Sequence, residues 1–489
     1  MEKKLRVLFA AFEAVPFMKT GGLGDVAGSL PMALRAAGCD ARLIMPSFAT
    51  IAPEYQKKMR RVAEFTVQLG WRNQPCTLYR MTHRGVPCYF IENDYYFGRD
   101  KAYGYYDDGE RIAFFSKAVA EAVDRIPGFS CDILHCNDWH TGLTPVYLRE
   151  CFPESEAHAK VKTVFTVHNL KFQGQFTDYM LGDVLGLYDV PAAAQQLRSD
   201  SSTINFMKGA LCYSDALTTV SPTYAEEIKT PWFGEKLEGI FQRRADILSG
   251  ILNGIDTDFY NPETDEALAV NYSAADLSGK ALCKAALQRE FGLEEKADVP
   301  LLTVITRLSE QKGPDLILHV LDELLAEGVQ LAVLGTGEKK YEDAFRSFTE
   351  RYPGQVSVAL RFDEMLSHRM YAGADLFLMP SQFEPCGLAQ MISMRYGTLP
   401  VVRETGGLRD SVAPYNCYTG EGTGFSFTNF NAHEMLGVIK SAVELYRNDK
   451  DAWHKLQLQA MAANFSWDRA AQEYLAIYRR LCPAGKKNS

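Results

Sequence analysis

Two glycine-bearing segments, each following an apolar run, constrain the fold of this chain most strongly. In the first half, the apolar run 5–11 precedes residues 19–26, with the sequence Lys-Thr-Gly-Gly-Leu-Gly-Asp-Val. In the second half, the apolar run 374–380 precedes residues 384–388, with the sequence Glu-Pro-Cys-Gly-Leu. Each segment stands where a buried strand ends and a helix begins, which is where open α/β sheets bind ligands. The two segments therefore predict one ligand held between two domains.

Strand-like and helix-like patterns alternate along the chain, which is typical of parallel α/β folding. In the first half, strands are expected at 5–11, 41–45, 86–91, 133–135 and 162–167, with helices at 28–37 and 110–122. An antiparallel hairpin is expected at 62–70 and 76–82. In the second half, strands are expected at 301–305, 330–334, 356–360, 376–379 and 399–402, with a helix at 314–326. We therefore predict two doubly wound, Rossmann-like domains.

The length of the chain sets the number of domains. A single hydrophobic core stops growing well below 489 residues, so two or three domains are expected. The dipeptide Asn-Gly breaks the pattern within 250–256, and we place the hinge there. The predicted division is a first domain at 1–250, a second at 251–467 and a C-terminal segment at 468–489 that begins with an amphipathic helix.

Composition excludes several classes of protein. The net charge of −9 argues against nucleic-acid binding, and it requires that an anionic substrate be held by a few well-placed lysines or arginines. The 11 cysteines include no Cys-x-x-Cys pair, which is typical of reduced thiols in the cytoplasm. No apolar run reaches the length of a membrane span, and the run near the N-terminus is interrupted by Arg6 and Glu13. We expect a cytoplasmic protein without a membrane or nucleic-acid partner.

The first glycine-bearing segment suits a phosphate. Gly21 and Gly22 let the backbone approach a ligand closely, with N–H groups available to a phosphate. Lys19 would add a positive charge, and Asp25 would cap the helix or accept from a sugar hydroxyl. The alternative is an ordinary glycine-rich turn with a solvated lysine. The lysine precedes the glycines, so this is not a Walker A loop, and the Gly-x-Gly-x-x-Gly fingerprint of dinucleotide binding is absent.

Two further strand ends of the first half carry polar and aromatic side chains. Asp138 and Trp139 follow the strand 133–135, where they could bond sugar hydroxyls and stack on a sugar ring. His168 and Asn169 follow the strand 162–167, although a lone histidine is most often structural. A zinc site at His135, Cys136 and His140 is disfavoured, because nothing nearby completes four ligands.

Cations and glycines follow the strands of the second half. Arg307 and Lys312 share one loop and suit a diphosphate, the alternative being an exposed charged loop. Glu384 is expected at a helix start, where it is either a dipole-favoured acid or an acceptor for sugar hydroxyls. Phe362 either stacks on a base or packs in the core. Backbone N–H groups could come from Gly335 and Gly337, a weak Gly-x-Gly signal, and from Thr405, Gly406 and Gly407.

These motifs together resemble the bacterial and plant starch/glycogen synthase family. The match covers about residues 5 to 480 and includes Lys-Thr-Gly-Gly-Leu-Gly-Asp-Val, Asp-Trp-His, Thr-Val-His-Asn-Leu, Arg-Leu-x-x-Gln-Lys-Gly and Ser-x-Phe-Glu-Pro-Cys-Gly-Leu in order. The resemblance implies two Rossmann-like domains facing a deep cleft, the GT-B architecture. It implies retaining transfer of glucose from ADP-glucose to the non-reducing end of an α-1,4-glucan such as glycogen, without a metal or cofactor. It also implies that the C-terminal helix returns to the first domain.

The resemblance also implies residue roles. The expected catalytic groups are Asp138, His168, Arg307, Lys312 and Glu384, with the two cations acting as a diphosphate clamp. The expected nucleotide-sugar site comprises Lys19, Gly21, Gly22, Asp25, Gly335, Gly337, Phe362, Cys386, Gly387, Leu388, Thr405, Gly406 and Gly407. Trp139 and Asn169 are expected to bind glucan, and no metal ligand is expected. Many retaining glycosyltransferases of this architecture carry a second glutamate at the position of Ile392, and its absence disfavours the sucrose and lipid branches.

Alternative functions remain at this point. One is a non-catalytic glucan-binding homologue, against which the retained charged residues count. Another is a nucleotide-linked oxidoreductase, disfavoured by the missing dinucleotide fingerprint. A third is a synthase that prefers UDP-glucose, since the preference for ADP rests on the resemblance alone.

Overall fold

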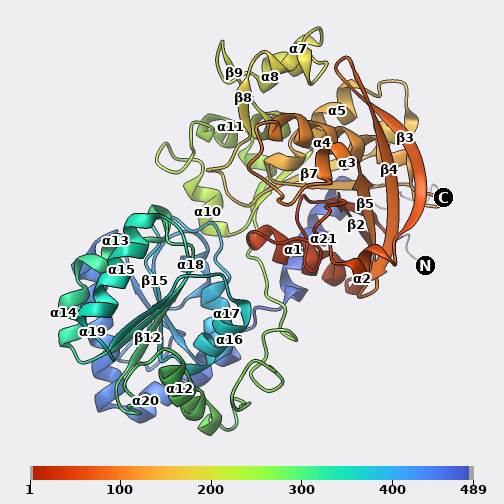
Figure 1. The fold of residues 1–489 in the computed structure, drawn as a ribbon. Coiled ribbons are helices and arrows are strands. Elements are labelled where there is room, and N and C mark those ends of the chain that lie inside the picture. Colours follow the sequence, from red (N-terminus) through yellow and green to blue (C-terminus); the bar gives the residue numbers. More distant parts are fainter. Residues whose placement is uncertain (1–3, 484–489) are drawn as a thin grey trace. The chain divides into compact units, whose positions relative to one another are not determined.

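The computed structural model describes residues 4–483, which fold into two compact units. The first unit runs to Gly254 and is joined again by the chain from Trp467 onward. The second unit is Ile255–Ser466. Figure 1 colours the chain along its sequence, so the returning C-terminal segment is the blue helix within the red-to-green unit. None of the helices within residues 4–483 is long and apolar enough to cross a membrane.

The first unit is built on a nine-stranded sheet. Its strands in spatial order are β11 (Leu248–Gly250), β10 (Ala216–Thr219), β7 (Lys162–Val167), β6 (Ile133–Asn137), β1 (Arg6–Ala10), β2 (Asp40–Pro46), β5 (Val86–Glu92), β4 (Arg72–His83) and β3 (Arg60–Leu69). The pairs from β11 to β5 are parallel, whereas β4 is antiparallel to both of its neighbours. The predicted hairpin is therefore confirmed, and it extends the edge of the main sheet.

Helices cover this sheet on both faces (Figure 1). Helix α1 (Gly22–Ala36) lies on one face, and α4 (Asp108–Arg125) and α5 (Thr144–Glu150) lie on the other. The shorter helices are α2 (Pro53–Gln56), α3 (Asp94–Phe97), α6 (Glu156–Lys160), α7 (Met180–Asp183), α8 (Pro191–Leu197), α9 (Phe206–Tyr213), α10 (Pro222–Glu227) and α11 (Glu238–Arg243). A small antiparallel pair joins β8 (Gln175–Thr177) to β9 (Thr203–Asn205).

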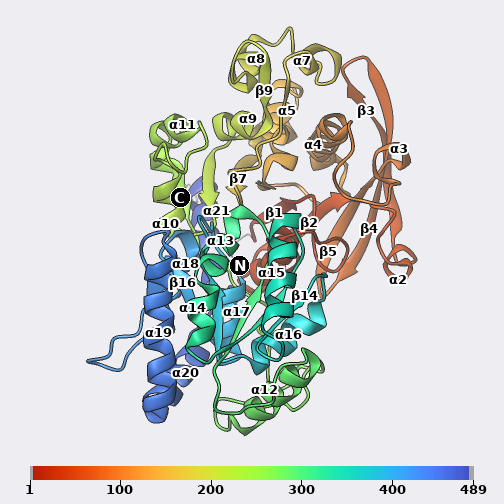
Figure 2. The same cartoon turned by 60° about the vertical axis from the view of Figure 1, so that its left-hand side comes forward.

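The second unit has a six-stranded, fully parallel sheet. The strands in spatial order are β14 (Val356–Ala359), β13 (Gln330–Leu334), β12 (Leu301–Ile305), β15 (Leu376–Met379), β16 (Leu399–Arg403) and β17 (Phe425–Phe427). Its helices are α12 (Ser278–Glu290), α13 (Pro314–His319), α14 (Leu321–Ala326), α15 (Lys339–Arg351), α16 (Glu364–Gly373), α17 (Ala389–Arg395), α18 (Gly406–Ser411), α19 (Ala432–Asn448) and α20 (Lys450–Ala462). Figure 2 shows these helices wrapping the sheet, the arrangement of a doubly wound domain.

Two predicted helices differ from the observed ones. The helix expected at 314–326 is split into α13 and α14, because Val320 leaves the helical region with φ −113° and ψ 12°. The helix expected at 28–37 is α1, which begins six residues earlier, at Gly22. Glycines are poor helix formers, so they conceal this start in the sequence.

The last helix, α21 (Trp467–Leu481), packs within the first unit against α1. Its Tyr474 and Tyr478 are fully buried. The Tyr478 hydroxyl is hydrogen-bonded to Nδ1 of His135, on the central strand β6, at 2.7 Å. Residues 484–489 of the predicted C-terminal segment lie outside the described part of the chain.

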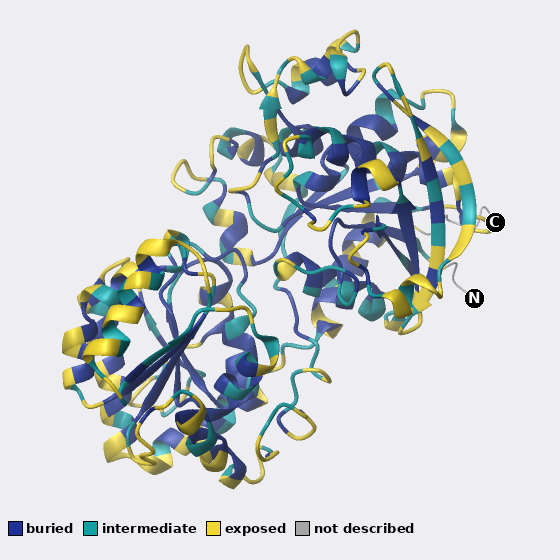
Figure 3. Ribbon diagram, in the orientation of Figure 1, coloured by how far each residue is buried: buried dark blue, intermediate teal, exposed yellow. Residues whose placement is uncertain are grey.

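Burial follows the layers in both units (Figure 3). The central parallel strands are buried along their length, apart from Lys162 at the start of β7, as sheets covered on both faces require. The outer strand β3 instead alternates and presents charged residues at its exposed positions. Such charges on an edge strand discourage pairing with another chain.

Candidate active site

Three adjacent strand ends bring the predicted residues of the first unit to one edge of its sheet. β7, β6 and β1 are neighbours and run parallel, so the loops that follow them leave at the same edge. These loops carry the segment before α1, Asp138 with Trp139, and His168 with Asn169. Topology therefore gathers groups that lie up to about 150 residues apart in the chain.

Lys19 lies immediately before α1 and is held by the helix. Its Nζ pairs with Oδ1 of Asp25 at 2.8 Å. The helix begins at Gly22 after an extended Gly21, and no side chain caps its first turn. Asp25 lies in the first turn of this helix, where it pairs with the lysine. Gly24 allows this geometry, since a Cβ there would lie 3.3 Å from the Lys19 backbone.

Asp138 has an unusual backbone and a buried carboxylate. Its φ is +55° with ψ 176°, which costs about 1–3 kcal/mol for a residue with a side chain and is found mostly at functional sites. Oδ1 accepts the backbone N–H of His168 at 2.7 Å and that of Asn169 at 3.4 Å. Burial raises the pKa of this carboxyl to about 7, and the nearby charge of Glu13 adds to the rise. The two strand-end loops after β6 and β7 are joined through this one oxygen.

The two histidines beside Asp138 are neutral. Nε2 of His168 donates to Oδ1 of Asn137 at 2.9 Å. The ring of His140 stacks on Phe12 with centroids 5.2 Å apart, and its Nδ1 is buried without a hydrogen-bond partner among the described residues. Burial lowers the pKa of both imidazoles to about 3. They therefore act as neutral hydrogen-bonding groups at physiological pH.

Both predicted glucan-binding residues, Trp139 and Asn169, are partly exposed. Trp139 is half-buried and lies against Phe176 and Phe206, with ring centroids 6.1 and 6.5 Å away. A Cβ at Gly174 would come within 2.3 Å of its ring, so the glycine admits the indole. The side chain of Asn169 accepts the backbone N–H of Lys171 at 3.1 Å.

In the second unit, a buried ion pair links the loops after β12 and β15. Nζ of Lys312 lies 2.6 Å from Oε2 of Glu384, and the Ser381 hydroxyl donates to the same oxygen at 2.9 Å. Glu384 is buried and Lys312 is half-buried. Arg307 is exposed, and its guanidinium makes no hydrogen bond or ion pair with another residue of the range 4–483.

The expectation that Glu384 starts a helix is wrong. Helix α17 begins at Ala389, and residues 380–388 form a loop. Gly387 has φ +72°, which is outside the helical region and keeps this segment out of the helix. The glutamate is thus placed by its ion pair and not by a helix dipole.

The glycines of the second unit let the strand-end loops touch. A Cβ at Gly335 would lie 1.8 Å from the carbonyl oxygen of Thr306, and one at Gly337 would lie 2.1 Å from that of Leu308. The Gly407 N–H already donates to the Glu384 carbonyl at 3.1 Å. The expectation that this N–H serves a ligand is therefore wrong, because loop packing consumes it.

The remaining nucleotide-sugar candidates lie on the same loops. Phe362 follows β14 and is 83% exposed, which excludes the core-packing alternative. Cys386 is buried, and Leu388 is the residue before α17. Thr405 precedes α18, which starts at Gly406 with φ +43°. All of these positions follow carboxyl ends of strands, where doubly wound sheets bind ligands.

Sequence reasoning missed several buried polar residues near these loops. Asn137 orients His168, and Tyr103 and Glu13 lie behind the lysine segment. The Asn253 side-chain oxygen is buried without a partner among residues 4–483. Only Glu13 gave a signal, as a charge just after an apolar strand, and it was interpreted merely as an interruption of that run.

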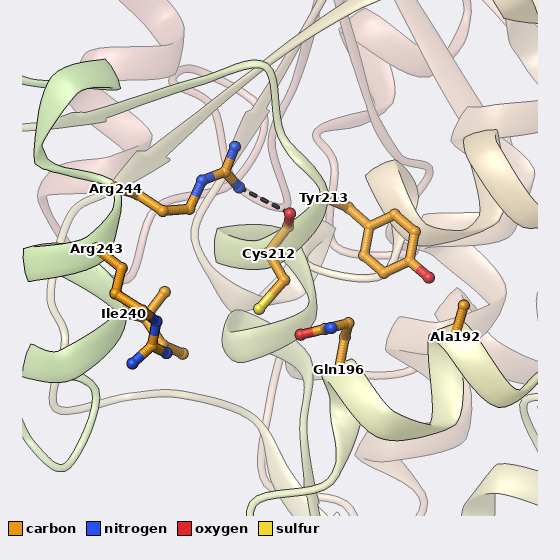
Figure 4. Close-up of a pocket in the computed structure, with 7 residues that line it drawn as sticks. All are labelled: Ala192, Gln196, Cys212, Tyr213, Ile240, Arg243 and Arg244. Atoms are coloured by element: carbon orange, nitrogen blue, oxygen red, sulfur yellow. Dashed lines mark hydrogen bonds between the residues drawn. The ribbon is translucent and has the colours of Figure 1, made fainter.

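No cluster of three or more metal-ligating side chains occurs within the described part of the chain. A pocket of about 400 Å³ lies elsewhere in the first unit, between α8, α9 and α11 (Figure 4). It is lined by Ala192, Gln196, Cys212, Tyr213, Ile240, Arg243 and Arg244, none of which is a predicted site residue.

Comparison with known proteins identifies the class first. A family model described as glycosyl transferases group 1 matches residues 288–455. The sucrose-phosphate synthase of Thermosynechococcus elongatus has the same fold, with a TM-score of 0.60 at 16% identity over 99% of this chain and 100% of that one. Two parallel α/β units with this match define a GT-B glycosyltransferase, which confirms the predicted fold class.

The family follows from the first half. A model described as starch synthase catalytic domain matches residues 6–243. The glycogen synthases of Geobacillus thermodenitrificans and Clostridium novyi are 52% and 50% identical over 477 residues, covering 98% of this chain and 98–99% of theirs. The chain belongs to the starch/glycogen synthase family, so the resemblance is confirmed and the oxidoreductase alternative is wrong.

A solved structure of this family is similar over nearly the whole chain. The catalytic domain of starch synthase IV from Arabidopsis thaliana, bound to ADP and acarbose, has a TM-score of 0.90 at 34% identity. The match covers 98% of this chain and 99% of that one.

Proposed function

We propose that this enzyme transfers glucose from ADP-glucose to the non-reducing end of an α-1,4-glucan with retention of configuration. The observation that carries the proposal is that one unit contains a buried carboxylate site and the other contains a cation-bearing site. The relatives named glycogen synthase, and a neighbour solved with ADP and acarbose, support the substrate classes.

The first unit supplies groups for the reacting sugar. When the bond from C1 to the phosphate oxygen breaks, positive charge develops on the sugar ring and is stabilised by nearby acceptors. Asp138 and the backbone carbonyl of His168 are proposed to be these acceptors. Trp139 and Asn169 are proposed to bind the glucan. The two backbone N–H bonds to Asp138 fix its carboxylate before the substrate arrives.

The second unit supplies groups for the leaving diphosphate. Arg307 and Lys312 are proposed to neutralise the charge that develops on it. Lys312 keeps two further N–H donors beyond its bond to Glu384, and that bond fixes the direction of the ammonium group. Lys19 is proposed to contact a donor phosphate as well, and the exposed ring of Phe362 to stack on the base.

We further propose that no metal or cofactor takes part and that the enzyme is cytoplasmic. Two placed cations can supply the positive charge for which other enzymes use Mg²⁺. Activity in excess EDTA should equal that of the untreated enzyme, and a loss that Mg²⁺ restores would contradict the proposal. All 11 cysteines are free thiols, which suits a reducing compartment.

An elongation assay tests the proposed reaction. The enzyme is given glycogen with labelled ADP-glucose or UDP-glucose, and label in the polymer is measured alongside the anomeric configuration of the new linkage by NMR. We expect α-linked incorporation from ADP-glucose at a kcat/KM well above that for UDP-glucose. Preferential use of UDP-glucose would contradict the proposed donor. Glucan binding without incorporation from either donor would contradict catalysis and indicate a binding protein.

A further inference from the structure

A buried carboxylate, Glu13, has no part in the reaction proposed above. It follows β1 by three residues and is only 4% exposed. A buried carboxylate is costly unless donors surround it, so its partners indicate what it does.

Glu13 receives hydrogen bonds from three donors. Its Oε2 accepts the backbone N–H of Thr20, and its Oε1 accepts the Thr20 hydroxyl at 2.8 Å and the Tyr103 hydroxyl at 2.5 Å. Two of the three bonds come from a single residue, the one that follows Lys19. The carboxylate therefore fixes both the backbone and the side chain of Thr20.

The chain between Glu13 and Thr20 is a closed turn. Ala14 pairs with Met18 as an antiparallel bridge, and the Val15 N–H donates to the Gly24 carbonyl of α1 at 2.9 Å. Lys19 lies between this turn and the bound Thr20, so its backbone direction is set on both sides. Its ammonium group is then oriented by Asp25, at 2.8 Å.

A carboxylate suits this position better than an amide would. All three partners donate, and an ionised carboxylate only accepts. A glutamine could still accept the Thr20 N–H and donate its NH₂ group to the two hydroxyls, which also accept. It would, however, reverse both hydroxyl bonds and lose the negative charge that strengthens all three.

We propose that Glu13 is a positioning residue that holds Thr20, and through it Lys19, in the direction needed to contact a donor phosphate. The inference rests on the role proposed for Lys19. Glu13 touches no substrate in this scheme, and its effect on the use of the donor passes through the lysine. Its charge also raises the pKa of Asp138, so an effect through that carboxyl would shift the pH profile and persist in a Lys19→Ala background.

Glu13→Gln tests the inference by steady-state kinetics. We expect kcat/KM for ADP-glucose to fall about tenfold to hundredfold, the range that follows from a displacement of about 1 Å, while KM for glycogen stays unchanged. In a Lys19→Ala background, Glu13→Gln should cause no further loss, because the group through which it acts is gone. A full additional loss in that background, or an unchanged kcat/KM in Glu13→Gln alone, overturns the inference.

Asp215→Asn is a matched control. Oδ2 of Asp215 accepts the N–H and the hydroxyl of a single threonine, Thr163, at 2.8 and 3.0 Å, at the start of β7, and it also accepts from Arg149 at 2.9 Å. This variant should lose stability as Glu13→Gln does but keep its donor kinetics. A comparable loss of kcat/KM in Asp215→Asn would mean that destabilisation alone explains the effect, and it overturns the inference.

Thr20→Val provides a second route if Glu13→Gln does not fold. It removes the exposed hydroxyl and keeps the backbone N–H and the charge of Glu13. We expect about a threefold loss in kcat/KM for ADP-glucose, and normal kinetics would overturn the inference. Normal kinetics in Lys19→Ala would instead contradict the proposed role of the lysine, so the two failures are distinguishable.

Discussion

The strand-end loops of the two units differ in the burial and charge of their polar groups. In the first unit the polar groups are buried: the pKa of Asp138 is raised to about 7, and those of His140 and His168 are lowered to about 3. In the second unit Lys312 is half-buried and paired with Glu384, and Arg307 is exposed. Burial disfavours charge, so the buried strand ends of the first unit suit a neutral sugar, whereas the cations of the second unit, like Lys19 before α1, suit a phosphate. The same topology thus supports two kinds of recognition.

The cations of the second unit should give the largest effect. Arg307→Ala or Lys312→Ala should each lower kcat by about 10²- to 10³-fold, because each removes charge that stabilises the leaving diphosphate. The measurement is single-turnover and steady-state transfer from ADP-glucose.

Arg351→Ala is the control for this prediction. Arg351 pairs with Asp322 at 2.7 Å on the surface of the same unit, and both partners are about half exposed. Its removal should leave kcat unchanged. If the site variants also turned over normally, the charged edge would be an ordinary solvated surface and the contrast between the units would lose its functional meaning.

The glycine contacts of the second unit should give the next largest effect. Gly335→Ala would place a Cβ 1.8 Å from the Thr306 carbonyl oxygen, and we expect a loss of about 3 kcal/mol in unfolding free energy, by denaturant titration. Gly437→Ala, in helix α19 with nothing within 4 Å, should instead stabilise by about 0.5–1 kcal/mol. Equal effects would show that loop packing does not shape this edge.

Acid stability tests the neutral state of the first unit. Burial lowers the pKa of His135, His140 and His168 to about 3, well below 6.5, so the unfolded chain binds more protons between these values. The free energy of unfolding should therefore fall as the pH falls from 6.5 towards 3, by about 1.4 kcal/mol per pH unit for each histidine. His135→Gln removes one of these three histidines, so it should reduce the slope of the unfolding free energy against pH by about 1.4 kcal/mol per pH unit. An unchanged slope would mean that the histidine is already charged in the folded protein.

The smallest effect is expected at Phe362. Because its ring is 83% exposed, Phe362→Ala should leave stability unchanged and raise KM for ADP-glucose about three- to tenfold by loss of stacking. Tyr418→Ala, at another exposed ring of the same unit, should change neither quantity. A normal KM in Phe362→Ala would remove the base-stacking role and leave the ring without a function.

The sequence allowed most of the two sheets to be predicted, because buried parallel strands are nearly continuous apolar runs. The strand β10 was not predicted, because its sequence, Ala-Leu-Thr-Thr, is not a continuous apolar run. Those threonines are fully buried because Thr219 donates to the Val167 carbonyl at 2.8 Å and Thr218 bonds to Thr166. Such pairing between distant segments has no local signature.

Some of the candidate site residues could be predicted because they follow strands that are recognisable in the sequence. Asp138 and His168 follow recognisable strands, and parallel neighbours place their ends together. Gly407 was misjudged because its contact with Glu384 joins two loops that are remote in sequence. The expected helix start at Glu384 was wrong because Gly387, with φ +72°, lies outside the helical region, and α17 begins only at Ala389. Spacing along the chain reveals candidates, whereas their hydrogen bonds depend on the folded loops.

The placement of α21 has a consequence for synthesis. The polypeptide leaves the ribosome from its N-terminus, so β6, with the His135 ring in its core, is made more than 300 residues before Tyr478, its hydrogen-bond partner. During that interval the whole of Ile255–Ser466 is translated and can fold as a unit of its own. Until α21 is made, the first unit lacks the helix that packs against α1. A released chain truncated after Ser466 should therefore be protease-sensitive in the first unit, whereas Ile255–Ser466 should be resistant.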